Sequence, residues 1–314
     1  MSKCLVTGGA GFIGSHLVDK LLDLGHRVVV LDDFSLGKKE NLAQHKNNSN
    51  LVVYKKSICD GLNNIFKKEK PAIVFHLAAL PRVQFSITHP KETHQVNVNG
   101  TLNLLETAKK FNSKRFIFSS SAAIYGEQKK LPLKEVMKAR PVFPYALHKL
   151  MSEDYAKLFN SLYGLETINL RYFNVFGPRQ DPKGDYACLI PKFIKSISQG
   201  TRPIINGNGQ QTRDFIFVGD VAEVNILASQ TKNKDCFGQN INIGAGQNKS
   251  VNQVTKEILK LSNKKIKPIH GPAVVEIKHS LADIKKAKKL LGWQSRISFE
   301  QGLNQTYQFF VEDN

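Results

Sequence analysis

The chain has 314 residues, a formal net charge of +19, and 41% hydrophobic and 9% aromatic residues. This composition is typical of a globular chain of one or two domains, and no run of about 18 apolar residues could span a membrane. The positive charge could attract nucleic acid, but the lysines are spread along the chain without interleaved aromatics. We therefore expect no nucleic-acid partner and no membrane partner.

The four cysteines are scattered and form no C-x-x-C pair. This spacing argues against a disulfide framework or a zinc site, and we expect no metal. The N-terminus leads directly into an apolar segment, so we also expect no signal peptide. Together these features predict a cytoplasmic location.

The first fourteen residues carry the strongest pattern. An apolar run at residues 3–7 predicts a buried strand, and apolar residues at helical spacing follow from residue 15. Between them, Gly8, Gly11 and Gly14 form a G-x-x-G-x-x-G turn. Glycines permit a tight turn and let a pyrophosphate approach the N-terminus of the helix. This strand–turn–helix unit therefore predicts dinucleotide binding.

An acidic residue follows at the spacing that dinucleotide sites need. A second strand is predicted at 27–31, and Asp32 closes it 18 residues after Gly14. A carboxylate there can bond the 2′-hydroxyl of the adenosine ribose and would repel a 2′-phosphate, a repulsion to which Asp33 adds. We therefore predict NAD, rather than NADP, as the cofactor.

The first half alternates short apolar strands with helical patterns. Further strands are predicted at 51–54, 72–76, 116–119 and 166–170, with long helices at 91–111 and 145–163. Repeated β-α-β units with buried strands predict an α/β fold, a Rossmann doubly wound parallel sheet.

The second half differs from the first because it is rich in residues that are typical of loops. Helices are predicted near 189–199, 219–230, 250–261, 282–291 and 298–311. We expect a first, NAD-binding domain at 1–173 and a smaller α/β substrate domain at 174–314, with segments near 214–242 returning to the first.

Two Y-x-x-x-K patterns compete for the role of catalytic base, Tyr145 with Lys149 and Tyr125 with Lys129. Residues four apart on a helix share a face, and an ammonium beside a phenol lowers the phenol pKa toward that of a useful base. A glycine directly after Tyr125 and a nearby proline rule out a helix there. Tyr145 opens a long amphipathic helix, so we predict Tyr145 and Lys149.

Three serines, residues 119–121, leave the predicted strand at its carboxyl end, where ligands bind in doubly wound sheets. A hydroxyl there can hydrogen-bond a reacting oxygen. It can equally satisfy the backbone of its own loop, and the pattern alone leaves both interpretations open.

Several motifs accompany these patterns in chain order. The whole chain resembles the extended short-chain dehydrogenases/reductases, within their nucleotide-sugar epimerase branch. The segments that carry this resemblance are Thr-Gly-Gly-Ala-Gly-Phe-Ile-Gly (7–14), His-Leu-Ala-Ala (76–79), Asn-Val-Asn-Gly-Thr (97–101), Ser-Ser-Ser-Ala-Ala-Ile-Tyr-Gly (119–126), Tyr-x-x-x-Lys (145–149), Arg-Tyr-Phe-Asn-Val-Phe-Gly-Pro-Arg (171–179) and Thr-Arg-Asp-Phe (212–215).

The resemblance implies a UDP-sugar 4-epimerase that works with bound NAD. The Tyr145 phenolate would remove the 4′-hydroxyl proton while hydride passes from C4′ to NAD. The 4-keto sugar would turn over, and hydride would return to its other face. Ser121 matches the catalytic serine. Related dehydratases and decarboxylases carry acids after this serine, but Ala122 and Ala123 stand here, so the chemistry should stop at epimerisation.

The resemblance also implies the binding residues. The expected cofactor contacts are Gly8, Gly11, Phe12, Ile13, Gly14, Asp32, Asp33, Ser57, Ile58, Leu77, Ala78, Ala79, Asn97, Ser119, Tyr145, Lys149 and Tyr172. The expected substrate contacts are Ser121, Ala122, Tyr145, Asn174, Gln180, Ala187, Leu189, Ile205, Arg213, Glu276 and Ser280. Two positions depart from the family: Ser57 replaces an adenine-binding Asp, and Ala273 replaces a diphosphate-binding Arg.

The sugar is expected from two positions. Ser280 stands where UDP-glucose-only epimerases carry a tyrosine, which leaves room for an acetamido group, and Gln180 resembles N-acetyl-preferring epimerases. Ser280 could instead be a small helix-entry residue. We expect interconversion of UDP-N-acetylglucosamine and UDP-N-acetylgalactosamine, and/or of UDP-glucose and UDP-galactose.

Two alternatives stay open, a UDP-glucuronate 4-epimerase and a non-catalytic NAD-binding scaffold or sensor. The resemblance also implies a homodimer packed through the 91–111 and 145–163 helices.

Overall fold

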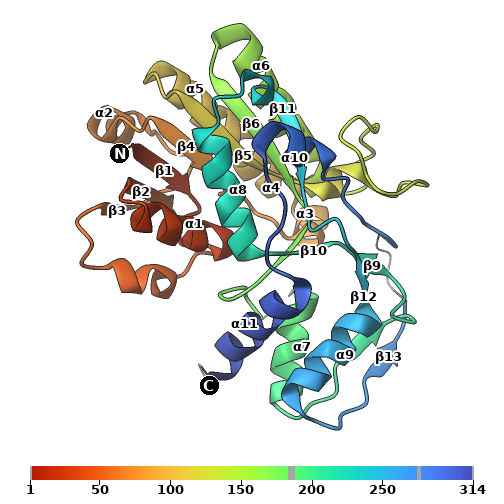
Figure 1. The fold of residues 1–314 in the computed structure, drawn as a ribbon. Coiled ribbons are helices and arrows are strands. Elements are labelled where there is room, and N and C mark those ends of the chain that lie inside the picture. The colour runs from red at the N-terminus through yellow and green to blue at the C-terminus, as the bar shows by residue number, and fades with distance from the viewer. Residues whose placement is uncertain (1, 183–187, 274–276, 313–314) are drawn as a thin grey trace.

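The computed structural model describes residues 2–182, 188–273 and 277–312. Its centre is a seven-stranded sheet with the order β11-β6-β5-β4-β1-β2-β3 (Figure 1). Every pair in this sheet is parallel. The strands are β1 (Lys3–Thr7), β2 (Arg27–Asp32), β3 (Leu51–Lys55), β4 (Ile73–His76), β5 (Arg115–Ser121), β6 (Glu166–Tyr172) and β11 (Gln239–Ile243). The predicted doubly wound α/β sheet is confirmed, and its order reverses between β1 and β4.

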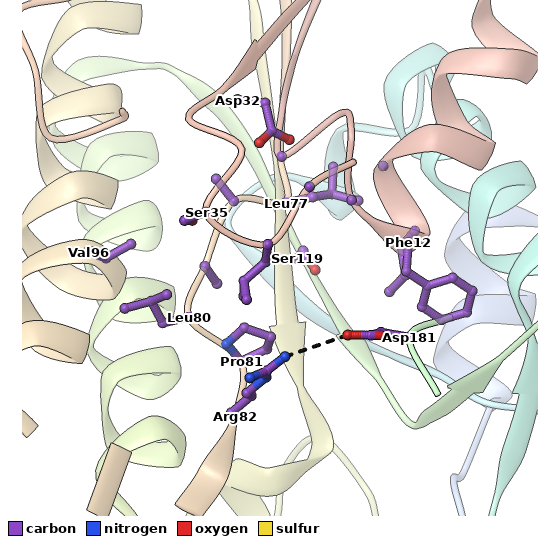
Figure 2. A pocket seen from close by; sticks show the side chains of 18 of the residues that line it. Phe12, Asp32, Ser35, Leu77, Leu80, Pro81, Arg82, Val96, Ser119 and Asp181 are labelled. Atoms are coloured by element: carbon purple, nitrogen blue, oxygen red, sulfur yellow. Dashed lines mark ion pairs between the residues drawn. The ribbon is translucent and has the colours of Figure 1, made fainter. Parts of the chain in front are cut away.

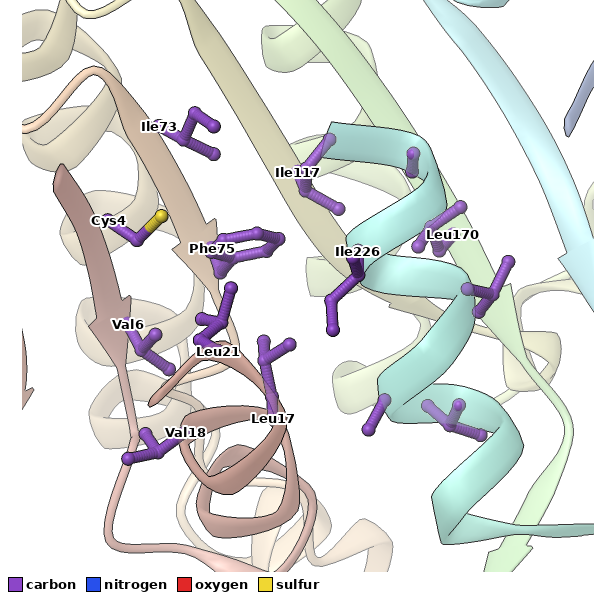
Figure 3. Close-up of a cluster of buried hydrophobic side chains, with 14 of the residues drawn as sticks. Cys4, Val6, Leu17, Val18, Leu21, Ile73, Phe75, Ile117, Leu170 and Ile226 are labelled. Carbon is purple, nitrogen blue, oxygen red and sulfur yellow. The ribbon is translucent and has the colours of Figure 1, made fainter. Parts of the chain in front are cut away.

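Helices cover both faces of this sheet. One face packs against α1 (Phe12–Asp23), α8 (Val218–Gln230) and α10 (Lys285–Leu291). The other packs against α2 (Asn63–Glu69), α5 (Gly100–Lys110) and α6 (Pro144–Tyr163). Figure 3 shows Leu17 and Leu21 of α1 and Ile226 of α8 against Val6 and Phe75. Because both faces are buried, the strands read as continuous apolar runs.

The helix predicted at 91–111 is interrupted. It consists of α4 (Pro90–His94), a π-helical turn at Gln95–Asn99 and then α5, and α3 (Val83–Thr88) precedes it. Within the wide turn, the Asn97 carbonyl oxygen accepts hydrogen bonds from Thr101 Oγ1 at 2.7 Å and Ser152 Oγ at 2.8 Å. Such turns often mark functional sites, and this one lies beside the cleft described below.

The helix predicted at 282–291 begins three residues late. Asp283 Oδ1 accepts a hydrogen bond from the Lys285 N–H at 2.9 Å, and the Asp283 N–H donates to the Leu133 carbonyl at 2.9 Å. Ala282 bridges to Leu133 in the manner of a strand. These contacts hold residues 282–283 in extended backbone, so α10 begins at Lys285.

The C-terminal part packs α7 (Leu189–Ser198), α9 (Val251–Ser262) and α11 (Phe299–Glu312) around its own apolar core. Short strand pairs accompany them: β7 (Asn174–Phe176) with β10 (Phe215–Phe217), β8 (Ile204–Asn206) with β13 (Ile269–Gly271), and β9 (Thr212–Arg213) with β12 (Lys249–Ser250). Single 3₁₀ turns lie at Lys39–His45, Ala122–Tyr125 and Lys234–Cys236. The expected domain division at residue 173 stays a prediction; α8 and β11 pack with the main sheet.

No helix in the described ranges is long and apolar enough to cross a membrane.

Candidate active site

A cleft of about 770 Å³ lies at the carboxyl ends of the central strands. Its walls include Asp32 at the end of β2, Leu77 after β4 and Ser119 near the end of β5 (Figure 2). Phe12 and Ile13 of α1 line another side. Ligands of open α/β sheets bind at this edge, beside the point where the strand order reverses, and the volume suits a small molecule.

The glycine turn is shaped for close approach of a ligand to bare backbone. Gly8 has a φ of +67°, and a Cβ there would lie 2.8 Å from the Ala78 nitrogen. A Cβ on Gly14 would lie 2.0 Å from the Gly8 carbonyl oxygen. The N-terminus of α1, with no acidic residue in its first turn, lines the cleft and suits a diphosphate. This cradle fits a dinucleotide.

Asp32 is a fixed, buried carboxylate at the cleft wall. Its side chain is 6% exposed, and its two oxygens accept hydrogen bonds from the Ala10 N–H at 2.9 Å and the Phe34 N–H at 2.8 Å. Burial raises the pKa of Asp32, and the two backbone hydrogen bonds act in the opposite direction. The position suits the ribose contact predicted from the sequence.

A buried histidine joins the glycine turn to the loop after β4. Ala78 N–H donates to Thr7 Oγ1 at 3.2 Å, and Thr7 Oγ1 lies 2.8 Å from His76 Nδ1. His76 Nε2 lies 2.8 Å from Thr101 Oγ1, which itself donates to the Asn97 carbonyl. These partners are all satisfied if Nε2 carries the proton. Burial lowers the pKa of His76 to about 3, so the ring is neutral.

The predicted catalytic residues lie together. Ser121 ends β5, Tyr145 lies in the first turn of α6, and the Ser121 side chain acts to lower the pKa of the Tyr145 phenol. Lys149, one turn further along α6, donates to the Ser119 carbonyl at 2.6 Å. Ser121 Oγ also accepts from the Ala123 N–H at 3.2 Å, so it serves its own loop as well as Tyr145. All three predicted catalytic side chains line the cleft.

The expected lowering of the Tyr145 pKa by Lys149 is wrong for this arrangement. Burial raises the pKa of Tyr145 to about 12, and the Ser121 hydrogen bond opposes that rise. The Lys149 ammonium lies 6.0 Å from the centre of the Tyr145 ring because it bonds to the strand instead. Burial lowers the pKa of Lys149 to about 7, although the negative charge of Glu153 acts to raise it.

The competing tyrosine has a different environment. Tyr125 is fully buried, its hydroxyl donates to Asn242 Oδ1 at 2.6 Å and accepts from Arg171 Nη1 at 2.8 Å. It ends a 3₁₀ turn, and no helix places it beside Lys129. Tyr125 is therefore a hydrogen-bonded core residue.

Of the predicted cofactor residues, all line the cleft except Asn97. Both ends of the Asn97 amide bond the backbone of Leu80, with Oδ1 accepting at 2.8 Å and Nδ2 donating at 3.0 Å. The side chain is thus engaged in holding the loop after β4, and the cofactor contact expected of Asn97 stays a prediction.

The predicted substrate residues are less well gathered. Gln180, with Ser121 and Tyr145, lines the cleft. Ile205 is 1% exposed within the C-terminal core and is not among the lining, so the substrate contact expected of it stays a prediction. The described lining does not include Ala122, Asn174, Leu189, Arg213 or Ser280. Ala187 and Glu276 lie outside the described residues.

The segment that follows Ser280 packs near the cleft. Two residues later, Ala282 packs in a small cluster with Ala122 and Phe173, and Phe173 lines the cleft. Arg213 Nη1 donates to the carbonyls of Thr212 and Lys278, which ties β9 to the segment leading to Ser280.

The structure shows an ionic bridge at the cleft that the sequence patterns did not indicate. Asp181 pairs with Arg82, after β4, and with Lys38, after β2, each at 3.7 Å (Figure 2 shows the Arg82 pair). All three line the cleft. No motif marks them, but their position just beyond carboxyl ends of strands could have indicated the two cations. Among the described residues, no group of three potential metal ligands occurs.

Comparison with known proteins agrees with this geometry. The family model described as GDP-mannose 4,6 dehydratase matches residues 5–306. The chain is similar to the UDP-glucose 4-epimerase of Thermotoga maritima, solved with UDP-glucose, at 40% identity over 99% of each chain and a TM-score of 0.94. It is as similar to the UDP-N-acetylglucosamine 4-epimerase of Methanobrevibacter ruminantium, solved with UDP-N-acetylmuramic acid, at 40% identity, 100% and 99% coverage, and a TM-score of 0.95.

A third similar structure was solved with a cofactor bound. The UDP-glucuronic acid 4-epimerase of Bacillus cereus, solved with UDP-glucuronic acid and NAD, shares 31% identity over 99% of this chain and 100% of its own, with a TM-score of 0.92. The resemblance read from the sequence motifs is thereby confirmed, as is NAD. The chain belongs to the extended short-chain dehydrogenase/reductase family and, within it, to the NAD-dependent UDP-sugar 4-epimerases.

Proposed function

We propose that the protein interconverts UDP-N-acetylglucosamine and UDP-N-acetylgalactosamine, with UDP-glucose and UDP-galactose as a second, less favoured pair. The observation that carries the proposal is Gln180, which is 7% exposed at the cleft. Its Nε2 donates to the Val175 carbonyl at 3.1 Å, and its Oε1 has no hydrogen-bond partner among the described residues. A buried acceptor left unpaired is costly, so a ligand donor is favoured there. The acetamido N–H would be such a donor.

Ser280 supports the same sugar. It is 8% exposed, its N–H donates to the Thr212 carbonyl at 3.1 Å, and its hydroxyl has no partner in the described chain. It precedes Ala282, which packs beside Ala122 near the catalytic serine. A small residue in this wall leaves volume that a tyrosine ring would fill.

We assign the proton chemistry to Tyr145 and Ser121. Tyr145 would take the 4′-hydroxyl proton of the sugar and later return it, while Ser121 orients that hydroxyl. Lys149, which lines the same cleft, would bind the nicotinamide ribose of the cofactor. The bound NAD supplies the hydride acceptor and donor. Ala122 and Ala123 offer no acid or base for a further elimination, which supports epimerisation rather than dehydration.

The alternatives fit less well. A UDP-glucuronate substrate brings a second anionic group, but Arg82 and Lys38 at the cleft are both paired with Asp181. A non-catalytic scaffold would have no use for a lysine buried at 4% exposure in the cleft wall together with Ser121 and Tyr145.

We also propose a homodimer through α5 and α6. Leu158 and Leu162 of α6 are 50% and 66% exposed, and Tyr163 is half-exposed beneath the ammonium of Lys109 from α5. An exposed apolar row on α6, beside α5, suits a second copy. The four cysteines carry no disulfide, which supports the expected cytoplasmic location.

Product analysis by NMR with a panel of UDP-sugars tests the proposal. We expect turnover of the acetylated pair at a higher kcat/KM than the non-acetylated pair, with a C4′ deuterium retained in the product. No turnover of the acetylated sugars, or a preference for UDP-glucuronate, contradicts the sugar assignment. Extensive loss of label contradicts hydride return.

A further inference from the structure

Three side chains of α6 face the strand end that carries Ser121. Tyr145, Lys149 and Glu153 are spaced four residues apart and therefore lie on one face of the helix. Lys149 and Glu153 are 4% and 0% exposed. Tyr145 and Lys149 have roles in the proposed chemistry. The Glu153 carboxylate is fully buried and takes no part in that chemistry. A buried charge is costly unless it is paired.

Glu153 is paired with Arg171 of β6. Glu153 Oε1 accepts from Arg171 Nε at 2.8 Å, and Oε2 accepts from Arg171 Nη2 at 2.7 Å, so the pair is bidentate. Glu153 Oε1 also accepts from Ser120 Oγ at 2.5 Å. Arg171 Nη1 continues to the Tyr125 hydroxyl, which bonds Asn242. The carboxylate thus joins α6, β5 and β6 at one point.

Ser120 links this pair to the catalytic residues. It lies between Ser119, whose carbonyl accepts a hydrogen bond from the Lys149 ammonium, and Ser121, whose side chain acts to lower the pKa of Tyr145. In the sheet register Ser120 lies opposite Arg171. Because three consecutive residues share one strand end, a displacement of Ser120 moves the partners of both Lys149 and Tyr145.

The charge of Glu153 also reaches Lys149. Burial lowers the pKa of Lys149, and Glu153 is the group that opposes this. The other groups around the ammonium are Tyr145 on α6, the neutral His76 on β4, and the Ser119 carbonyl and Phe118 ring on β5, the ring centre lying 4.8 Å away. Arg171 on β6 is neutralised by Glu153. Without the carboxylate, the buried Lys149 ammonium would lose the charge that opposes the lowering of its pKa.

We propose that Glu153 and Arg171 form a positioning pair for the catalytic group. Through Ser120 the pair holds the end of β5, and its carboxylate supplies the negative charge that a buried Lys149 ammonium needs. Neither residue is among the described lining of the cleft, so neither acts on substrate directly. The inference rests on the epimerase activity but not on which sugar is preferred.

Two variants distinguish the positioning role of the pair from the effect of its charge on Lys149. Glu153→Gln keeps the shape and removes the charge. We expect the Lys149 titration, followed by NMR with ¹³Cε-labelled lysine and assigned with Lys149→Arg, to move to lower pH, and the basic limb of the kcat profile to move with it. Ser120→Ala keeps the charge and removes one hydrogen bond. It should lower kcat roughly tenfold or more at every pH, without moving the titration.

A matched control exists at the other end of the same two strands. Arg115 of β5 pairs with Glu166 of β6, directly opposite it in the register. Glu166→Gln should lower the melting temperature and leave the Lys149 titration and kcat unchanged. This control distinguishes a general effect of losing an ion pair between β5 and β6 from the specific effect of losing the Glu153–Arg171 pair.

The outcomes are distinguishable. An unchanged Lys149 titration in Glu153→Gln overturns the charge role, and an unchanged kcat in Ser120→Ala overturns the positioning role. If Glu153→Gln fails to fold, Glu153→Asp, which keeps the charge, should retain the wild-type titration, and a shift to lower pH there refutes the proposal. If the wild type turns over no UDP-sugar, the function fails, while the NMR titration still tests the pair.

Discussion

Gly8 and Ala78 approach so closely that a Cβ on Gly8 would lie 2.8 Å from the Ala78 backbone nitrogen. The same Ala78 N–H donates to Thr7 Oγ1, directly before Gly8 in the chain. The turn after β1 and the loop after β4 are therefore held together at the point where the strand order reverses. This contact sets the floor of the cofactor cradle, and it makes Gly8 the first position to test.

Gly8→Ala should weaken NAD binding and the fold. A φ of +67° costs a non-glycine residue about 1–3 kcal/mol, and the added Cβ would push against backbone rather than a movable side chain. Thermal unfolding and calorimetric titration with NAD measure both effects. Gly61→Ala is the matched control, because a Cβ there meets nothing within 4 Å and its φ is not positive. Equal behaviour of the two variants would contradict the close-approach argument.

Asp32 should make NAD the preferred cofactor over NADP. Its carboxylate is held at the cleft wall by the Ala10 and Phe34 N–H groups and would repel a 2′-phosphate. We expect calorimetry of the apo protein to give NAD binding at least tenfold tighter than NADP, about 1.4 kcal/mol. Asp32→Asn should narrow that ratio, while Asp154→Asn, at an exposed surface ion pair, should not. NADP binding as tight as NAD in the wild type would refute the assignment.

Tyr145→Phe should reduce kcat by about 10²–10⁴ while NAD binding and the fold are kept, because the hydroxyl is the proposed acid–base group. Tyr125→Phe serves as the contrast. It removes the buried hydrogen bonds to Asn242 and Arg171, so it should lower the melting temperature and reduce kcat per folded molecule far less. Equal losses of kcat in the two variants would show that the wrong tyrosine was chosen.

Ser280→Tyr should abolish turnover of the acetylated sugars and spare UDP-glucose and UDP-galactose, because the site loses volume without losing a catalytic group. The kcat/KM ratio of the two substrate pairs measures this. Ser280→Ala keeps the volume and should keep the wild-type preference. An unchanged preference in Ser280→Tyr would contradict the volume argument.

His76 should make the fold sensitive to acid. Its pKa falls from an ordinary 6.5 to about 3 on burial, so the unfolded chain binds more protons than the folded one between these values. The contribution is complete above about pH 6.5 and is lost as pH falls toward 3. Urea unfolding from pH 7 to 4 should show decreasing stability, with a shallower slope in His76→Gln. The exposed His270→Gln should keep the wild-type slope.

Local patterns were sufficient for six strands of the sheet and for the cradle, whereas the seventh strand, β11, reads Gln-Asn-Ile-Asn-Ile and was not predicted. Continuous apolar runs predicted the strands because both sheet faces are buried, and the glycine spacing with Asp32 predicted the dinucleotide site because it lies within one β-α-β unit. The choice of Tyr145 over Tyr125 was equally local, since a glycine after Tyr125 prevents the helix that a Tyr–Lys pair needs.

Contacts between distant segments could not be read in this way. Asn97 was assigned to the cofactor, but a π-helical turn brings its amide to Leu80, seventeen residues earlier. Ile205 was assigned to the substrate, but it packs into the core around α7 and α9. Lys149 was expected to act on the Tyr145 phenol, whereas the Ser119 carbonyl holds it. Each of these contacts depends on which hydrogen-bond or packing partners the fold brings close to the side chain.

The sequence by itself determined the fold class and predicted the nucleotide cradle, because these rest on periodicity and on spacings within one β-α-β unit. Tyr145 and Lys149 were predicted from the spacing within one helix, and Ser121 from the family resemblance. Only the tertiary structure decided how those groups are held. It placed Glu153 and Arg171 behind the catalytic strand end, closed the Asp181 bridge across the cleft and left Gln180 Oε1 unpaired. Burial and partner choice set the charge state of a side chain, and both exist only once distant segments have packed.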